Sequence, residues 1–281
     1  MNLLKQHFVE VNDAKLEIFQ GGAGSPAVCC QHPHSPNLER FQWYADQTEL
    51  IYVVARGLGN SSPVKEKRDL TYLQAAHDLE DVRRKLGIAR WVVQGFSAGS
   101  QVALLYALTY PDSLTGLISI AGFARGSNLL ANPNSQCSPI YPGYQFDLEA
   151  LQRKTVWRSP AVLSSTEHYW AQVGSQAWGF FHGDIPLALM PGKKLHDRLK
   201  AAFEEVALFD VDDRLNEIQV PTLVIGGRHD PIVPIEESIG IHKNIPNSSL
   251  LVLENSKHGA EGEDVAIFED AVRRFFSKLA P

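Results

Sequence analysis

The sequence predicts an α/β fold: a doubly wound, mostly parallel sheet with a helical insertion. Short runs rich in Val, Ile and Leu alternate with helical patterns through most of the chain. These runs lack the apolar–polar alternation of strands that face water on one side, which is typical of parallel strands covered by helices on both faces. The alternation of strands and helices stops between residues 123 and 216, where helical patterns continue without a buried-strand run.

Length and composition favour a globular chain with a large core. The 281 residues are 44% hydrophobic and 21% charged, which suits one α/β domain with an insertion. The formal net charge is −6, so we expect neither a nucleic-acid partner nor an anionic membrane surface. No apolar run is long enough to cross a bilayer, and residues 1–10 show no cleavage signal.

The three cysteines, Cys29, Cys30 and Cys137, do not form the even framework of a disulfide-rich secreted domain. We therefore expect a reducing compartment and a cytoplasmic protein. Cys29 and Cys30 lie within an apolar run, so we expect both to be small buried side chains.

The first predicted element is a β-hairpin over residues 7–20. Two β-rich runs flank Asn12-Asp13, a pair that suits a tight turn. A glycine cluster at 21–24 follows the hairpin. Glycines that cradle a phosphate stand before a helix, whereas this cluster precedes a strand, so we interpret it as a turn.

Six further strands are expected from the apolar runs, with helices making right-handed crossovers between them. They lie at 27–31, 50–55, 90–95, 115–121, 221–227 and 249–254. On this basis we predict a core domain formed by residues 1–122 and 217–281. Residues 123–216 are then a helical insertion between two strands of the core.

Two helices have clear apolar faces. One apolar stripe predicts a helix over residues 71–86, which begins with a capping box of Thr71 and Gln74 and ends at Gly87. A second stripe, from Val265 to Leu279, predicts a final amphipathic helix.

A nucleophile motif lies at Gly95-Phe96-Ser97-Ala98-Gly99. It follows the predicted strand at 90–95 and opens a helical run, so Ser97 stands at a sharp strand-to-helix turn. Such a turn lifts the serine hydroxyl clear of the sheet edge, and the two glycines leave room for neighbouring segments. The helix N-terminus behind Ser97 favours the negative charge that develops when a serine attacks a carbonyl.

Other segments accompany this motif: RGLGNS at 56–61, a histidine after the third strand, GRHDPIVP at 227–234 and SKHG at 256–259. Together with GFSAG they make the sequence resemble the α/β-hydrolase family over nearly its whole length. The resemblance implies a serine-based machinery that needs no metal or organic cofactor, with the insertion at 123–216 as a cap over the active site. The family supports many reactions, so the resemblance specifies the machinery better than the substrate.

In this family the acid and then the base follow the serine, each in a loop after a late strand. Of the ten histidines, His258 lies in the loop after the strand at 249–254. Asp230 lies in the loop after 221–227, where its carboxylate would orient His258 and stabilise the imidazolium. Glu254 is nearer to His258 in the sequence, but its place at the end of a strand favours a strand-end polar group.

Two backbone N–H groups are expected to form the oxyanion hole. Family members often have His-Gly after the third strand, whereas this chain has His32-Pro33-His34. Proline has no N–H, and the resemblance implies the next residue, His34, as one donor and Ala98 as the other. The chain also has Val54 where an Asp often precedes the Arg-Gly pair, and Ser100 where a second glycine often follows the nucleophile motif.

The two histidines of this loop do not predict a metal site, because no third ligand is spaced to join them. Aromatic side chains of the insertion are expected either to line an apolar substrate pocket or to pack as the core of the cap. The candidates for substrate contact are His32, Phe96, Phe123, Trp157, Trp170, Trp178 and Phe181.

The sequence therefore predicts a hydrolase that cleaves an ester or lactone of a small, largely apolar molecule. A carbon–carbon bond hydrolase and a proline-iminopeptidase-like peptidase stay open within the same fold, since no residue decides between them. A serine nucleophile argues against a dehalogenase or an epoxide hydrolase, for which an aspartate would be expected. A ligand receptor that kept the fold and the triad is the alternative from another class. The oligomeric state is left open.

Overall fold

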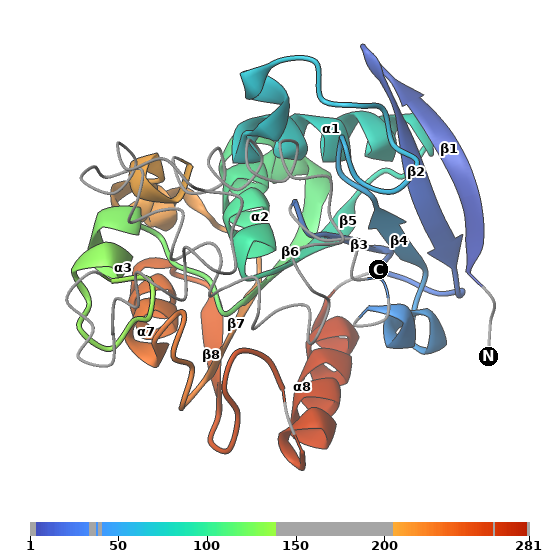
Figure 1. Cartoon of the computed structure of the whole chain (residues 1–281). Helices are drawn as coiled ribbons and strands as arrows, with labels where there is room; N and C mark the ends of the chain where they lie inside the picture. The colour runs from blue at the N-terminus through green and yellow to red at the C-terminus, as the bar shows by residue number, and fades with distance from the viewer. Residues whose placement is uncertain (1–3, 34–37, 39–40, 139–204, 261, 280–281) are drawn as a thin grey trace, which may run out of the picture.

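The computed structural model describes residues 4–33, 38, 41–138, 205–260 and 262–279. The described residues form a sheet of eight strands with helices on both faces (Figure 1). In chain order the strands are β1 (Lys5–Val11), β2 (Ala14–Gly21), β3 (Val28–Gln31), β4 (Leu50–Val53), β5 (Trp91–Phe96), β6 (Leu114–Ile120), β7 (Thr222–Gly227) and β8 (Ser248–Leu253). The predicted α/β class is confirmed, and the ends of the six predicted buried strands are shifted by at most two residues.

The strands lie in the order β1-β2-β4-β3-β5-β6-β7-β8. β1 and β2 form the predicted hairpin, in which Val11 pairs with Ala14 across the turn at Asn12-Asp13. β2 pairs antiparallel with β4, and every pairing from β4 to β8 is parallel. The carboxyl ends of β3 and β5 to β8 therefore meet at one edge of the sheet, which is where ligands bind in open α/β sheets.

Helices cover both faces of the sheet (Figure 1). They are α1 (Tyr72–Lys85), α2 (Ala98–Thr109), α3 (Gly126–Ala131), α7 (Ile235–Asn244) and α8 (Asp264–Lys278), with short helices η2 (Gln42–Asp46), η3 (Lys67–Leu70), η4 (Pro111–Ser113) and η7 (Asp212–Glu217). One buried cluster contains residues of α1, α2 and α7, and another contains residues of η2 and α8. Cys29 faces the first cluster and Cys30 the second, and both are fully buried, as expected.

The helix α1 begins as predicted, with one difference at its cap. The Thr71 hydroxyl accepts a hydrogen bond from the N–H of Gln74 at 3.1 Å. The Gln74 side chain does not complete the capping box, because it donates to Asp78 one turn further along, and the Thr71 N–H donates to the carbonyl of Arg68 instead. Gly87, with φ +68°, follows the end of the helix.

The two ends of the predicted insertion lie side by side. Arg125 and Asp210 form an isolated antiparallel bridge. The N–H of Gly126 donates to the carbonyl of Phe209 at 2.8 Å, and the N–H of Val211 donates to the carbonyl of Ala124 at 2.9 Å. The segments 124–126 and 209–211 are thus paired through their backbones. Most of the predicted insertion, residues 139–204, lies outside the described residues.

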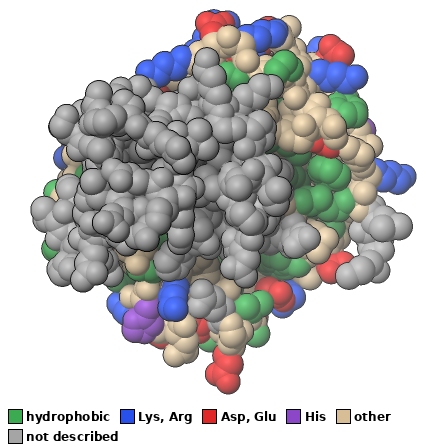
Figure 2. Space-filling view, in the orientation of Figure 1, with side chains coloured by type: hydrophobic (Ala, Val, Ile, Leu, Met, Phe, Trp, Pro, Cys, Tyr) green, Lys and Arg blue, Asp and Glu red, His purple; other side chains and the backbone are tan. Residues whose placement is uncertain are grey.

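Charged side chains of both signs are interspersed over the described surface seen in Figure 2. Several pair with each other, as Arg273 and Glu269 do on α8 at 2.8 Å. None of the helices that the structure describes has the length and apolar character needed to cross a membrane.

Candidate active site

Ser97 occupies the turn between β5, which ends at Phe96, and α2, which begins at Ala98. Its backbone has φ 52° and ψ −124°, a conformation that residues with a side chain rarely adopt. The N–H of Ser97 donates to the carbonyl of Ile120 on β6 at 2.9 Å, which anchors the turn to the sheet. Ser97 therefore stands at the carboxyl edge of the sheet, with the N-terminus of α2 beside it.

Two glycines make this turn possible. A Cβ on Gly95 would lie 2.0 Å from the carbonyl oxygen of Gly99, and a Cβ on Gly99 would lie 2.5 Å from the carbonyl oxygen of Gln31. Both contacts are with backbone, so no larger residue fits at either position without a backbone shift. Ser100, where family members often have a second glycine, forms an Oγ–Oγ hydrogen bond of 2.6 Å with Ser119 on β6.

His258 and Asp230 come together from the loops after β8 and β7. Nδ1 of His258 lies 2.6 Å from Oδ2 of Asp230, and both side chains are almost fully buried. The second carboxylate oxygen, Oδ1, accepts hydrogen bonds from the backbone N–H groups of Ile232 and Val233, at 2.8 and 3.0 Å. These bonds hold the Asp230 carboxylate in one orientation. Because Nδ1 of His258 is bonded to Asp230, any proton transfer by His258 takes place at Nε2.

Backbone contacts hold these two loops together. The N–H of His229 donates to the carbonyl of Ser256 at 3.0 Å. A Cβ on Gly227 would lie 1.9 Å from the carbonyl oxygen of Lys257, so only glycine lets the loops approach this closely. The distance between Asp230 and His258 therefore depends on backbone packing as well as on their own bond.

Asp264, the first residue of α8, braces the loop that carries His258. Its Oδ2 accepts hydrogen bonds from the Ser256 hydroxyl at 2.7 Å and from the N–H of Asn255 at 2.8 Å. The bond from Ser256 is the main reason that the pKa of Asp264 lies below its usual value. No motif in the sequence singles out Asp264, whose one sequence signal is a carboxylate in the first turn of a helix.

Glu254, the alternative acid, lies at the surface. Its side chain is 61% exposed and pairs with Arg228 at 2.8 Å, and the hydrogen bond from Arg228 lowers its pKa. Asp230, by contrast, is fully buried against His258.

The other candidates are the residues expected to contact substrate and the oxyanion donor His34. The ring of Phe96, the residue before Ser97, lies 5.0 Å from the ring of His258 and 6.4 Å from that of His32, measured between centroids. Phe123 is buried in the core and packs edge-to-face against Phe209. The candidates that lie outside the described residues are His34, Trp157, Trp170, Trp178 and Phe181.

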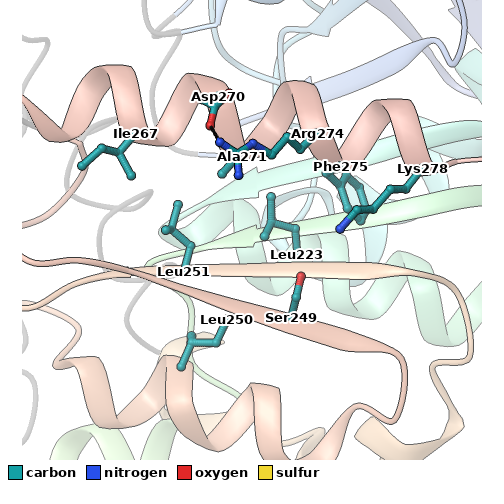
Figure 3. A pocket seen from close by; sticks show the side chains of 10 residues that line it. All are labelled: Leu223, Ser249, Leu250, Leu251, Ile267, Asp270, Ala271, Arg274, Phe275 and Lys278. Carbon is teal, nitrogen blue, oxygen red and sulfur yellow. Dashed lines mark ion pairs between the residues drawn. The ribbon is translucent and has the colours of Figure 1, made fainter.

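Described residues form two pockets that border α8. One is a cavity of about 330 Å³ between η2, the ends of β5 and β6 and the start of α8, and His258 lies in its wall. The other is a groove of about 460 Å³ between α8 and the edge strand β8, lined by Leu251, Ile267 and Phe275 among others (Figure 3). None of the predicted catalytic residues lines this groove. Within the described ranges, no group of three His, Cys, Asp or Glu side chains is arranged to hold a metal ion.

Comparison with known proteins agrees with this architecture. Residues 19–263 match the family model of the alpha/beta hydrolase fold. A probable proline iminopeptidase of Leptolyngbya boryana is 26% identical and covers 91% of this chain and 88% of its own. A 2-hydroxy-6-oxononadienedioate/2-hydroxy-6-oxononatrienedioate hydrolase 2 of Pseudomonas putida is 24% identical and covers 94% of this chain and 92% of its own.

Among solved structures, an alpha/beta fold family hydrolase from Bacillus anthracis str. Sterne superposes with a TM-score of 0.74 at 23% identity. The match covers 99% of this chain and 100% of that one. With its sheet order and the matching family model, the chain belongs to the α/β-hydrolase fold family of hydrolase enzymes.

Proposed function

We propose that the chain is a serine hydrolase in which Ser97 is the nucleophile, His258 the general base and Asp230 the acid that orients it. Its substrate is an ester or lactone of a small, largely apolar molecule. The backbone of Ser97 carries the proposal, because a positive φ at a residue with a side chain is strained and such strain clusters at functional sites. The buried hydrogen bond between Asp230 and His258 supplies the base that an unactivated serine hydroxyl needs.

The reaction runs in two halves. Oγ of Ser97 attacks the carbonyl carbon while Nε2 of His258 takes its proton, and the carbonyl electron pair moves onto oxygen. The intermediate collapses, and the leaving alcohol takes the proton from His258, which leaves an acyl group on Ser97. Water then attacks this acyl group with His258 again as the base, releasing the acid and restoring the serine. Asp230 keeps its negative charge throughout and stabilises the imidazolium.

The proposal also includes an oxyanion hole and a cap over the active site. The N–H of Ala98, at the start of α2, and that of His34 stabilise the oxyanion. Residues 1–122 and 217–281 form the catalytic core, and residues 123–216 form a cap that excludes water and supplies the apolar pocket walls. The paired segments at 124–126 and 209–211 support this division, since they bring the ends of the cap together.

A second candidate is a peptidase that releases an N-terminal proline. It is favoured by the probable proline iminopeptidase that matches nine-tenths of this chain. The same triad would serve, because an amide carbonyl is attacked in the same way as an ester carbonyl. A hydrolase of carbon–carbon bonds is suggested in the same manner by the relative from Pseudomonas putida.

A substrate panel separates these candidates. Purified protein is assayed with 4-nitrophenyl acetate and butyrate, a γ-lactone and proline 2-naphthylamide, with the Ser97→Ala protein as the blank. We expect turnover of at least one ester or lactone to exceed that of the blank by several decades. Turnover of the proline amide alone would favour the peptidase. Equal rates for the wild type and Ser97→Ala on every compound would contradict a serine hydrolase and favour a receptor.

A further inference from the structure

The acid loop, residues 228–234 between β7 and α7, is hydrogen-bonded to residues that follow α3. Figure 1 shows α3 and α7 at the same end of the sheet. The N–H of Gln136 donates to the carbonyl of Pro231 at 2.6 Å, and the hydroxyl of Ser135 donates to the carbonyl of Ile232 at 2.7 Å. Two neighbouring residues after α3 thus bind two neighbouring carbonyls of the acid loop.

These two carbonyls belong to the peptide groups that hold the Asp230 carboxylate. A peptide group joins the carbonyl of one residue rigidly to the N–H of the next. The carbonyl of Pro231 therefore shares a peptide group with the N–H of Ile232, which donates to Oδ1 of Asp230 at 2.8 Å. The carbonyl of Ile232 shares the next one with the N–H of Val233, which donates to the same oxygen at 3.0 Å. Two hydrogen-bond chains thus run from the residues after α3 to the carboxylate.

A hydrogen bond to the carbonyl of a peptide group acts on its N–H in two ways. It polarises the group, which strengthens the N–H as a donor. It also stops the group from rotating, and because the group is planar, the N–H direction is fixed as well. Both effects keep Oδ1 of Asp230 occupied, so that Oδ2 is the oxygen that faces Nδ1 of His258 at 2.6 Å. The residues after α3 thereby help to orient His258 through Asp230.

The side chain of Ser135 is itself held in one orientation. The residue is fully buried, and its own N–H donates to the carbonyl of Asn132 at 3.0 Å. The hydroxyl accepts a hydrogen bond from the N–H of Cys137 at 3.0 Å, so its proton is available for the carbonyl of Ile232. A buried hydroxyl with both roles assigned is a preorganised donor.

We propose that Ser135 is a positioning residue for the catalytic acid. It fixes the peptide group between Ile232 and Val233, so that Asp230 keeps His258 in its catalytic orientation. The inference rests on the proposed function, because it takes Asp230 and His258 as acid and base. Ser135 acts through the acid loop and takes no part in the chemical steps.

Ser138 offers a matched control for substitution of Ser135. It is also fully buried, and its hydroxyl donates to the carbonyl of Leu130 in α3 at 2.7 Å, the same length as the bond from Ser135 to Ile232. Changing either serine to alanine removes one buried hydroxyl from one carbonyl, so we expect similar losses of Tm. Only the bond from Ser135 leads to Asp230.

Kinetics on the best ester of the panel separate positioning from stability. We expect Ser135→Ala to lower kcat roughly tenfold and to leave KM within about twofold, because it disturbs the acid and not the substrate pocket. Ser138→Ala should keep kcat within about twofold of the wild type. Ser135→Thr, which keeps the hydroxyl, should restore most of the lost kcat. Equal losses of kcat in Ser135→Ala and Ser138→Ala would overturn the proposal.

Each variant is first checked for folding by thermal melting. Ser135→Cys has nearly the shape of the wild type and a weaker donor, so its kcat should lie between those of Ser135→Ala and the wild type. If Ser135→Ala does not fold, Ser135→Cys decides the outcome. Wild-type kcat in a folded Ser135→Cys and a folded Ser135→Ala would overturn the proposal.

Proton NMR of His258 tests the same role without turnover. With ¹⁵N-labelled histidine, the Nδ1–H that donates to Asp230 gives a resonance that reports the geometry of this bond. We expect it to move in Ser135→Ala and to keep its wild-type position in Ser138→Ala. If the wild type hydrolyses no ester or lactone but the resonance moves in this way, the proposed function fails and the positioning of His258 stands. A resonance that keeps its wild-type position in folded Ser135→Ala would overturn the positioning role.

Discussion

At the scale of single residues, neighbouring residues stabilise the strained backbone conformation of Ser97. A non-glycine residue in this part of φ/ψ space costs on the order of 1–3 kcal/mol. The cost is tolerated because Gly95 and Gly99 remove the side chains that would collide with the turn. The hydrogen bond from the Ser97 N–H to Ile120 then fixes the strained residue to β6. A strained position that its neighbours hold so firmly is the expected place for a nucleophile.

The first prediction separates the two possible acids. Asp230→Asn should lower kcat by several decades, because an amide at this position favours the wrong tautomer of His258. Glu254→Gln should leave kcat unchanged, since Glu254 is an exposed partner of Arg228. Both variants are assayed with the best ester of the panel. Normal activity of Asp230→Asn together with a large loss in Glu254→Gln would reverse the assignment.

The positions of Ser97, Asp230 and His258 in turns directly after strands could be predicted from the sequence, because each residue stands in a motif next to a strand. Asp264 could not, since its role depends on the loop of Asn255 and Ser256 folding back over the start of α8.

At the scale of elements, α7 connects the acid loop to the entry of the predicted cap. Glu237, in its first turn, is half-buried and hydrogen-bonds with Asn132, just after α3. Burial raises the pKa of Glu237 from 4.5 to about 7. The native protein thus binds this proton more tightly than the unfolded chain does. The contribution of Glu237 to stability therefore falls as the pH rises from about 4.5 to about 7, and it stays low above that range.

The second prediction follows from this linkage. Glu237→Gln, which cannot ionise, should raise Tm relative to the wild type more at pH 8 than at pH 5. Thermal melts across this pH range measure the difference. Glu236→Gln removes a neighbouring negative charge that helps to raise the pKa of Glu237, so it should raise Tm in the same direction with pH but by less than Glu237→Gln. A pH-independent shift in Glu237→Gln would contradict the raised pKa.

The strands and helices can be predicted from the sequence, because buried strands and amphipathic helices have strong local patterns. The sequence predicts the ends of these elements less accurately. The strand predicted at 50–55 stops at Val53, although the N–H of Val54 still donates to the carbonyl of Glu17 on β2 at 3.0 Å. The capping box at Thr71 is half-formed, since Asp78, one turn further along α1, accepts the hydrogen bond from the Gln74 side chain. In that case one local side-chain contact replaces another.

At the scale of the whole molecule, Arg56 joins the hairpin, η3 and α1. Its guanidinium contacts Asp78 through two nitrogens, at 2.7 and 2.8 Å, and Asp13 at 2.7 Å. Asp69, also buried, lies 3.5 Å away. Burial raises the pKa of Asp78 despite the arginine, so this carboxylate depends on Arg56 to stay charged. The resemblance drew attention to the Arg-Gly segment, but no local pattern predicts these three acidic partners.

The third prediction concerns this cluster. Arg56→Met should lower the free energy of unfolding by about 3–5 kcal/mol, because it leaves buried carboxylates without their cation. Arg228→Met, which removes an exposed arginine paired with Glu254, is the matched control and should change the free energy of unfolding far less than Arg56→Met does. Urea unfolding measures both. Equal losses of unfolding free energy in the two variants would contradict a stabilising role for the ion pairs of Arg56.

The measurement that tests the central claim most directly is covalent labelling of Ser97. Native protein is treated with a fluorophosphonate probe, digested with trypsin and analysed by fragment mass spectrometry. We predict one adduct on the peptide 91–125, placed at Ser97 and not at Ser100, Ser113 or Ser119 of the same peptide. Ser97→Ala and heat-denatured protein should carry no label. A folded protein that stays unlabelled, or an adduct on another residue, would contradict a serine mechanism at this turn.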